Sequence, residues 1–474
     1  MSHTGCSLHI DSAEPFLPHI DRFQQALMLQ CNGSVRINLT PPMLVPHLTT
    51  ALSGPILDLE RRILDAMPII EHWLRGQWQE HAVPFYCSVD LRNSGFKLAP
   101  VDTNLFPGGF NNLNPDFMPL CVQAMMAAVE RICPDAHSVL LIPENHTRNI
   151  FYLQNVATLQ AIMRHAGLNI RIGTLLPEIT IATTIDLPNG GGITIEPVLR
   201  RGNRLGVEGF DPCAVLLNND LSSGIPETLQ NLDQSIIPPL HAGWATRRKS
   251  QHFMAYDGVA QEFAKLIGID PWLINPYFAY CGEINFHEKK GEDCVSGNTD
   301  EILREIREKY AQYGVKQDPF VIVKADAGTY GMGIMTVRDG DEVRALSRKQ
   351  RNKMSVAKGG LPVTKVLVQE GVYTLESINQ AVAEPVIYMI DRYVVGGFYR
   401  VHTGRGIDEN LNAPGMHFEP LAFATTSLLP DREAHPDCAP NRFYAYGVVA
   451  RLALLAAARE LERGVASAPA KTNL

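Results

Sequence analysis

The sequence predicts a mixed α/β protein built from more than one domain, and three observations lead to this fold class. The chain has 474 residues, which is longer than one hydrophobic core usually supports. Hydrophobic residues make up 45% of it and charged residues 19%, a balance that is typical of a large, well-buried enzyme and excludes disorder as the main state. The third observation is a β–α–β pattern that starts at Ser138 and indicates an open sheet with helices packed on it.

The elements of this first sheet are read from short apolar runs on either side of a helix-length amphipathic stretch. They are strands at 138–142, 169–173, 193–199 and 214–217, and a helix at 149–165. The last strand is followed by Asn218-Asn219-Asp220. Ligands of such sheets collect at the carboxyl ends of the strands, so these polar residues lie where a ligand is expected.

The rest of the chain divides into an irregular beginning and a second half rich in strands. Residues 1–135 are rich in proline, with helical pieces around 56–73 and 117–132. The helix predicted at 300–313 has Asn298 or Thr299 as its N-cap, and Gly314 follows its end. The other expected elements are helices at 250–267 and 444–463, and strands at 320–324, 333–337, 366–369, 386–391 and 393–395.

Charge and cysteine usage exclude several classes of protein. The 42 basic and 50 acidic residues give a formal net charge of −8, which argues against a protein that coats nucleic acid or an anionic membrane. Nine cysteines are scattered singly without a Cys-x-x-Cys pair, as in reduced intracellular proteins. No apolar stretch is long enough to span a bilayer, and the N-terminus lacks a signal-peptide pattern. We therefore expect a soluble, cytoplasmic protein.

The sharpest local signal is a β-branched strand that ends in Lys324 and runs into a loop with Gly328, Gly331 and Gly333, after which a second strand begins. Glycines let a backbone approach polyphosphate closely, and a lysine neutralises its charge. The segment contains neither the Walker phosphate loop nor the dinucleotide fingerprint. It is predicted to be a phosphate-binding flap, although a glycine-rich hairpin with a surface lysine is the alternative.

Three later features support nucleotide binding in this order along the chain. An apolar strand ends in Gln369-Glu370-Gly371, as a hinge would whose backbone meets adenine and whose Glu370 meets ribose. Arg400 follows on a predicted strand and would clamp a transferring phosphoryl group. Asn410 lies in a loop dense in glycine, asparagine and carboxylates and would orient that group. Each feature alone has a simple alternative as a turn or a solvated face.

That order resembles the ATP-grasp ligases, and it adds Lys249 in Thr246-Arg247-Arg248-Lys249-Ser250 as the lysine at a helix start. Over nearly the whole chain the sequence resembles, more specifically, the proteobacterial glutamate–cysteine ligase family related to ATP-grasp enzymes. The stretches that carry this likeness are 88–92, 97–113 and the glycine flap. The resemblance implies a Rossmann-like lobe plus a two-lobed ATP-grasp domain, preceded by an irregular helical N-terminal region.

The expected domains follow from this resemblance. They are an N-terminal helical and substrate-loop region, a Rossmann-like lobe, an ATP-grasp domain, and a C-terminal helix with its tail, at residues 1–135, 136–245, 246–440 and 441–474.

The metal site departs from the family pattern. ATP-grasp enzymes place a Glu-x-Asn pair of metal ligands on a strand after the final large helix, and this chain stops at that helix. Glu283 and Asn285 have the same spacing upstream, and in a strand residues i and i+2 point to one face. They are the expected ligands for Mg²⁺, with Glu409 as the fallback, and an ordinary polar strand end is the alternative. The sequence leaves the choice between Mg²⁺ and Mn²⁺ open.

A substrate-binding loop is predicted from Asp102 to Asn112, where asparagine, aspartate and glycine alternate with leucine, phenylalanine and proline. Arg92 and Lys97 are expected to take substrate carboxylates and Asp102 an ammonium group. A capped connector between helices is the alternative. The full set of expected substrate ligands is Arg92, Lys97, Asp102, Asn104, Asn111 and Asn112.

The predicted function is ATP-dependent formation of γ-glutamylcysteine from glutamate and cysteine through an acyl phosphate, the first step of glutathione biosynthesis. Two alternatives stay open: a glutathione synthetase-like or other ATP-grasp peptide ligase, and a non-catalytic nucleotide-binding protein. The expected partners are glutamate, cysteine and ATP, without nucleic acid or membrane. The oligomeric state cannot be predicted from these patterns.

Overall fold

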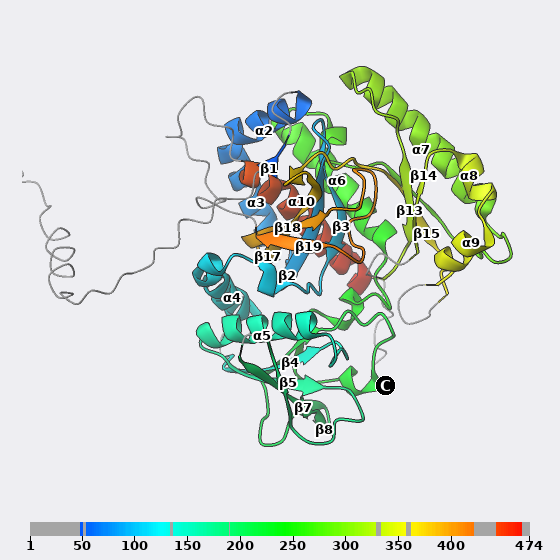
Figure 1. Ribbon diagram of the computed structural model, residues 1–474. Helices are drawn as coiled ribbons and strands as arrows, with labels where there is room; N and C mark the ends of the chain where they lie inside the picture. The colour runs from blue at the N-terminus through cyan, green and yellow to red at the C-terminus, as the bar shows by residue number, and fades with distance from the viewer. Residues whose placement is uncertain are drawn as a thin grey trace, which may run out of the picture. The chain divides into compact units, whose positions relative to one another are not determined.

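The protein is described by a computed structural model that contains three large sheets and the helices packed on them (Figure 1). The described residues are 48–50, 54–132, 136–188, 190–328, 333–356, 362–420 and 442–466. Gly331 of the predicted flap lies outside them. The mixed α/β fold class predicted from the sequence is confirmed.

The first sheet has six strands in the order β11-β10-β4-β5-β7-β6. All neighbours in it are parallel except β6, which is antiparallel to β7. The predicted β–α–β unit is confirmed, because α5 (Ile150–His165) connects the parallel neighbours β4 and β5 and packs beside α4 (Met118–Ile132). The strands are β4 (Ser138–Pro143), β5 (Asn169–Thr174), β6 (Thr183–Asp186), β7 (Gly192–Pro197), β10 (Ala214–Asn218) and β11 (Ser235–Ile237).

The second sheet has four antiparallel strands in the order β12-β15-β13-β14. Three of these strands were predicted: β13 is the lysine strand, β14 is the strand after the flap, and β15 is the hinge strand. Helix α7 (Glu292–Tyr313) packs against it, with α8 (Gly340–Arg344) and α9 (Arg348–Met354) at its β14 side. The strands are β12 (Phe278–Cys281), β13 (Val321–Ala325), β14 (Ile334–Val337) and β15 (Val366–Glu370).

The third sheet has seven strands and joins segments from opposite ends of the chain. Strand β17 (Ala381–Ile390) pairs with β18 (Tyr393–His402) on one edge, and on its other edge with β16 (Ser377–Ile378) and with β2 (Tyr86–Asn93). The sheet is completed by β3 (Leu98–Asn104), β19 (His417–Pro420) and β1 (Leu48–Thr49). The hairpin of β2 and β3 was not predicted, because the sequence before residue 135 was expected to be irregular and helical.

Helix α10 (Arg442–Ala466) packs against β2, β3 and β17, and α6 (Lys249–Ile267) packs against α10. Residues 444–458 of α10 are all buried, which explains their alanine- and leucine-rich sequence. Arg451 within this run is 4% exposed, and its charge is balanced by two bonds of 2.9 and 2.7 Å to the carboxylate of Glu71. Arg451 is the buried partner of this pair, whereas the Glu71 side chain is 37% exposed, so removing Glu71 would leave a buried charge without its partner and removing Arg451 would not.

Two helices near the start of the described chain and a short ribbon complete the fold. The helices are α2 (Pro55–Asp65) and α3 (Met67–Glu80), where the sequence predicted one helical piece. The ribbon is made of β8 (Leu199–Arg201) and β9 (Arg204–Gly206). Within the described ranges, no helix is long and apolar enough to cross a membrane.

Two local predictions were wrong. Helix α7 begins at Glu292 and not after Asn298 or Thr299, because Gly291 adopts a left-handed conformation and two acidic residues in the first turn suit the positive end of a helix. The strand expected to present Glu283 and Asn285 on one face ends at Cys281, and Glu283 has a positive φ of 54°.

Candidate active site

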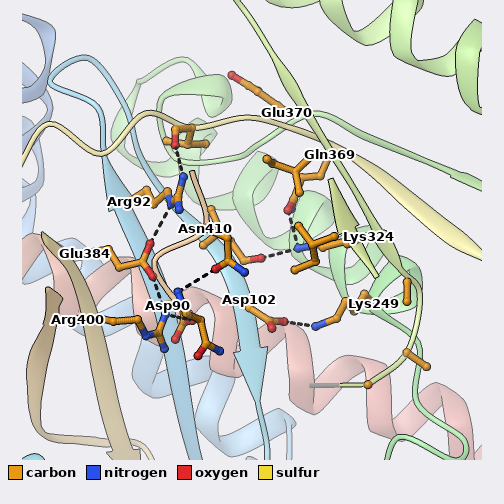
Figure 2. Close-up of a pocket in the computed structure, with 18 residues that line it drawn as sticks. Asp90, Arg92, Asp102, Lys249, Lys324, Gln369, Glu370, Glu384, Arg400 and Asn410 are labelled. Atoms are coloured by element: carbon orange, nitrogen blue, oxygen red, sulfur yellow. Dashed lines mark hydrogen bonds and ion pairs between the residues drawn. The ribbon is translucent and has the colours of Figure 1, made fainter. Parts of the chain in front are cut away.

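A cavity with an empty volume of about 810 Å³ lies where the second and third sheets face each other (Figure 2). We call it the first cavity. Its walls come from β2, β3, β13, β14, β15, β17 and β18, from the first residue of α6, and from the loops that follow β13, β15 and β18. The polar side chains in its lining are Asp90, Arg92, Asp102, Lys249, Lys324, Gln369, Glu370, Glu384, Arg400, Asn410 and Asn412.

Lys324 is buried at the end of β13, and its ammonium group is held between two sheets. Its Nζ donates to Gln369 Oε1 at 2.8 Å on β15 and to the carbonyl of Val101 at 2.7 Å on β3. Burial lowers the pKa of Lys324 to about 7, because the charged form loses its hydration; Asp102 opposes this shift and Lys249 adds to it. An anion that entered the cavity would therefore raise the pKa of this lysine.

Lys249 reaches the same place from the first turn of α6. Its Nζ donates to Asp102 Oδ1 at 2.6 Å. Asp326 ties the start of α6 to the end of the lysine strand, since its carboxylate accepts from the backbone N–H of Ser250 at 2.7 Å and from the hydroxyl of Ser250 at 2.9 Å. Burial alone would raise the pKa of Asp102, but Lys249 and Lys324 outweigh it and hold that pKa well below its usual range.

Arg400 on β18 is the centre of a buried charge network. Its NH1 lies 2.9 Å from Asp90 Oδ2 and 2.5 Å from Glu384 Oε1. The second oxygen of Glu384 accepts from Arg92 Nε at 3.0 Å. Although burial disfavours its charge, the two carboxylates raise the pKa of Arg400, so this guanidinium stays protonated. Burial raises the pKa of Asp90 despite the attraction of Arg400.

A second cavity, with an empty volume of about 1240 Å³, shares Asp90, Asp102, Arg400 and Asn412 with the first. It extends from this shared wall toward α5 and the carboxyl ends of β4 and β10. Aromatic side chains and amides dominate its lining. Its lining includes Asn104, Gly108, Gly109, Asn111, Asn112, Tyr152, Asn155 and Tyr388.

The geometry is thus a charged cavity between two sheets that opens along Asp90 and Asp102 into a larger polar cavity. A model of the glutamate–cysteine ligase family, GshA, matches residues 60–461. The chain belongs to this family. It is therefore a ligase, and the family implies ATP and a divalent metal ion as cofactors.

One solved structure agrees with this assignment. A crystal structure from Methylobacillus flagellatus KT, which carries the provisional name gamma-glutamylcysteine synthetase, is 69% identical with a TM-score of 0.83, and the match covers 89% of this chain and 100% of that one. A search of the curated proteins found no match.

Two distant structures are also similar to parts of the chain. D-alanyl-alanine synthetase A from Vibrio cholerae O1 biovar eltor str. N16961 is 12% identical with a TM-score of 0.32, covering 67% of this chain and 81% of that one. A glutathione synthetase-like effector, GSS30, from Globodera pallida is 11% identical with a TM-score of 0.33, covering 77% and 80%. At these values neither likeness carries an argument.

Most of the residues that the sequence predicted to bind ATP line the first cavity. Lys249, Lys324, Gly328, Gln369 and Glu370 all line it. The two residues predicted to be catalytic, Arg400 and Asn410, also line this cavity.

Gly333 adjoins this lining through the lysine strand. Its carbonyl accepts from the N–H of Ala325 at 3.1 Å, and its φ is 62°. Gly328 has a φ of 99°, a left-handed conformation that favours glycine.

Glu370 and Lys97 were expected to bind ribose and a substrate carboxylate, but they form an ion pair with each other in the interior. Glu370 Oε2 lies 2.7 Å from Lys97 Nζ, and both side chains are at most 1% exposed. The other carboxylate oxygen of Glu370 accepts from Trp272 Nε1 at 3.1 Å, and Figure 2 shows this side chain extending away from Lys324. The carboxylate oxygens are bonded in the interior, so the geometry does not support the ribose contact. The same pair keeps Lys97 away from the cavities.

The predicted metal ligands of the ligase are not brought to either cavity. Glu283 is 84% exposed and pairs with Lys290 at 3.1 Å, while Asn285 Oδ1 accepts from the N–H of His287 at 3.1 Å within its own turn. The carboxylate of Glu409 accepts from the N–H of Gly406 at 2.7 Å in its own loop. Among the described residues, no group of three or more His, Cys, Asp and Glu side chains is arranged to hold a metal ion.

Apart from Lys97, the predicted substrate residues divide between the two cavities. Asn104, Asn111 and Asn112 line the second cavity and Asp102 lines both. Arg92 lines the first, where its guanidinium is already engaged with Glu384 and with the carbonyls of Val372 and Glu409 at 3.1 and 2.6 Å.

Sequence reasoning missed Asp90, Glu384 and Asn412, which line the first cavity. Asp102 and Asn104 have on β3 the i, i+2 spacing that was sought at Glu283 and Asn285. The pairings that bring Asp90 on β2 and Glu384 on β17 to the same place are seen only in the structure. The cavity thus receives its carboxylates from strands that precede α10 in the chain.

Proposed function

We propose that the protein joins glutamate to cysteine with ATP, giving γ-glutamylcysteine, ADP and phosphate through a γ-glutamyl phosphate intermediate. One observation carries this proposal: two lysines, two arginines and four carboxylates from two sheets and a helix start converge on one cavity that continues into a second, polar one. A phosphate donor and an amino-acid acceptor need such adjoining spaces.

The first cavity suits the triphosphate of ATP. Lys249 and Lys324 present ammonium groups from a helix start and a strand end, and Gly328 leaves backbone exposed beside them. Their present partners are a carboxylate, an amide oxygen and a carbonyl, which phosphate oxygens would replace. Glycine at the wall allows the close backbone approach that phosphates require. The backbone at Gln369 is proposed to meet the adenine.

Arg400 is proposed to stabilise the phosphoryl group in transit, with Asn410 orienting it. The γ-carboxylate oxygen of glutamate attacks the γ-phosphorus of ATP, the bond to ADP breaks, and an acyl phosphate forms. The amine of cysteine then attacks the acyl carbon, phosphate leaves with the bonding electron pair of the C–O bond, and the amine gives up a proton. Fixed positive charge at Arg400 lowers the barrier because it needs no reorganisation during phosphoryl transfer.

The carboxylates fit a divalent cation, for which Mg²⁺ is proposed. Asp90 and Asp102 are direct cross-strand partners on β2 and β3, and both line the two cavities. Like charges in this arrangement repel each other. Mg²⁺ in nucleotide sites uses one or two carboxylates together with substrate phosphates, so a three-carboxylate cluster is not required. When bound, the ion would neutralise charge on the phosphates.

The amino-acid substrates are proposed to bind in the second cavity, where Asn104, Asn111 and Asn112 offer amide donors and acceptors. Asp102 at the shared wall would attract an ammonium group. The reaction is proposed to occur in the cytoplasm as the first step of glutathione biosynthesis.

The experiment is ADP release by the purified protein with ATP, Mg²⁺, glutamate and cysteine, each omitted in turn. We expect release that depends on both amino acids and a product with the mass of γ-glutamylcysteine. Release that requires γ-glutamylcysteine and glycine instead would favour the glutathione synthetase-like alternative. No amino-acid-dependent release with any of these substrates would contradict the proposal. Restored glutathione in a bacterium that lacks glutamate–cysteine ligase would test the pathway.

A further inference from the structure

The turn at residues 107–110 is held by buried side chains through four successive backbone groups. Asn155 of α5 holds two of them, because its Oδ1 accepts from the N–H of Gly109 at 2.9 Å and from the N–H of Phe110 at 3.0 Å. Asn155 is 1% exposed. Water therefore cannot replace these bonds at low cost if the side chain is removed.

Asn218, the last residue of β10, braces Asn155 and holds the turn itself. Its Oδ1 accepts from Asn155 Nδ2 at 3.0 Å, and its Nδ2 donates to the carbonyl of Pro107 at 2.9 Å. The hydroxyl of Tyr152 donates to the carbonyl of Asn218 at 2.6 Å. Asn218 is also 1% exposed, so the two amides form a buried pair whose hydrogen bonds fix their orientation.

The remaining carbonyl of the turn, that of Gly108, accepts from the hydroxyl of Tyr388 on β17. The turn is thus fastened to the six-stranded sheet and to the seven-stranded sheet at once. Gly109 has a φ of 106°, and a Cβ atom built on it would lie 2.9 Å from the Tyr388 hydroxyl. The backbone has little room to move at this point.

This fastened turn forms part of the wall of the second cavity. Gly108, Gly109, Asn111 and Asn112 line that cavity together with Asn155. The N–H of Asn112 bonds to the carbonyl of Gly109 at 2.9 Å, so the two substrate-facing asparagines follow directly from the turn. A shift of the turn would displace the amides proposed to contact the amino-acid substrates.

We infer that Asn155, braced by Asn218, is a positioning residue that sets the affinity for the amino-acid substrates by fixing the turn at 107–110 as a wall of the second cavity. This inference rests on the proposed function for the identity of those substrates. It assigns no contact between Asn155 and the reacting atoms. The first cavity is not touched by the turn, so ATP binding is independent of it.

The kinetic test compares Asn155→Ala with the wild type and with Thr158→Ala. Thr158 lies on the same helix, and its hydroxyl donates to the carbonyl of Gln154 within that helix. In N155A the KM for at least one amino-acid substrate rises roughly tenfold to a hundredfold, the loss typical of misplacing a substrate-positioning group. The KM for ATP stays within about twofold of the wild type, and T158A behaves as the wild type does. Equal rises for ATP and amino acids, or no rise for either, would overturn the inference.

If N155A does not fold, Asn155→Asp carries the kinetic test. It keeps an oxygen acceptor for the N–H groups of Gly109 and Phe110 but loses the donor to Asn218. A smaller rise in the amino-acid KM, at least about threefold with the ATP KM unchanged, supports the inference. An amino-acid KM equal to that of the wild type contradicts it.

A second readout separates this inference from the proposed function. Hydrogen exchange followed by mass spectrometry reports the protection of the Gly109 and Phe110 amides in peptides that span 108–112. We expect that protection to fall in the Asn155 variant and to persist in T158A. Unchanged protection would sink the inference even if the ligase activity is as proposed. If wild-type protein uses neither glutamate nor cysteine, the proposed function fails while the exchange result still decides the role of Asn155.

Discussion

The affinity for ATP is predicted to fall as the pH rises above 7, because Lys324 must be protonated to hold a phosphate. Burial lowers the pKa of this lysine to about 7 in the free protein. Half of the molecules then carry the charge at pH 7, about one in eleven at pH 8 and about one in a hundred at pH 9. A bound polyphosphate raises the pKa of the lysine, so binding takes up a proton over this range. The dissociation constant for ATP should increase by up to about fiftyfold from pH 7 to pH 9.

Isothermal titration of a non-hydrolysable ATP analogue from pH 7 to pH 9 measures this dependence. Lys324→Arg is the matched control, because a guanidinium stays protonated throughout and should flatten the curve. Lys324→Met should bind weakly at every pH. If the affinity of the wild type is flat between pH 7 and pH 9 and the methionine variant binds as tightly, Lys324 does not contact the triphosphate.

Three further predictions concern charges in and around the site. Arg400→Met should lower kcat/KM about 10²–10³-fold by removing charge stabilisation, and should lower the free energy of unfolding by about 3–5 kcal/mol because Asp90 loses its ion-pair partner and Glu384 keeps only Arg92; wild-type kinetics would count against its role. Lys97→Met should lower the free energy of unfolding, measured in urea, by about 3–5 kcal/mol, because the charge of Glu370 is left buried without its ion-pair partner. The folded variant should keep the wild-type KM for the amino acids. Glu283→Ala should change the free energy of unfolding by less than about 1 kcal/mol, because its ion pair is exposed. It should also leave the metal dependence of turnover intact, and a changed metal requirement would show that Glu283 is a metal ligand.

The fold could be predicted well where local pattern and tertiary structure agree. The β–α–β unit and the strands on either side of the flap are set by apolar runs of the right length, so their positions follow from sequence. The hairpin of β2 and β3 could not be predicted in this way. Its strands contain Pro100, Asp90 and Asp102, which are rare in strands, and its stability comes from pairing with β17, far along the chain.

The candidate site was predicted in the same uneven manner. Lys324 and Arg400 were predicted because each lies on a recognisable strand, and Lys249 because the resemblance to ATP-grasp ligases implies a lysine at a helix start; all three line the first cavity. Lys97 and Glu370 were misread because sequence alone does not reveal that two opposite charges satisfy each other in the interior. A charged residue near a motif is equally compatible with a ligand contact and with a buried ion pair, and only the pairing geometry separates the two.

The most direct test of the account uses glutamate labelled with ¹⁸O in its γ-carboxylate. If that carboxylate is activated by phosphoryl transfer in the cavity around Lys324 and Arg400, one labelled oxygen from each turnover must appear in inorganic phosphate. Mass spectrometry of the phosphate reads this out, with unlabelled glutamate in ¹⁸O-free water as the blank. γ-Glutamylcysteine that forms while the labelled oxygen it loses appears in water or in another product, and none appears in phosphate, would contradict the acyl phosphate route.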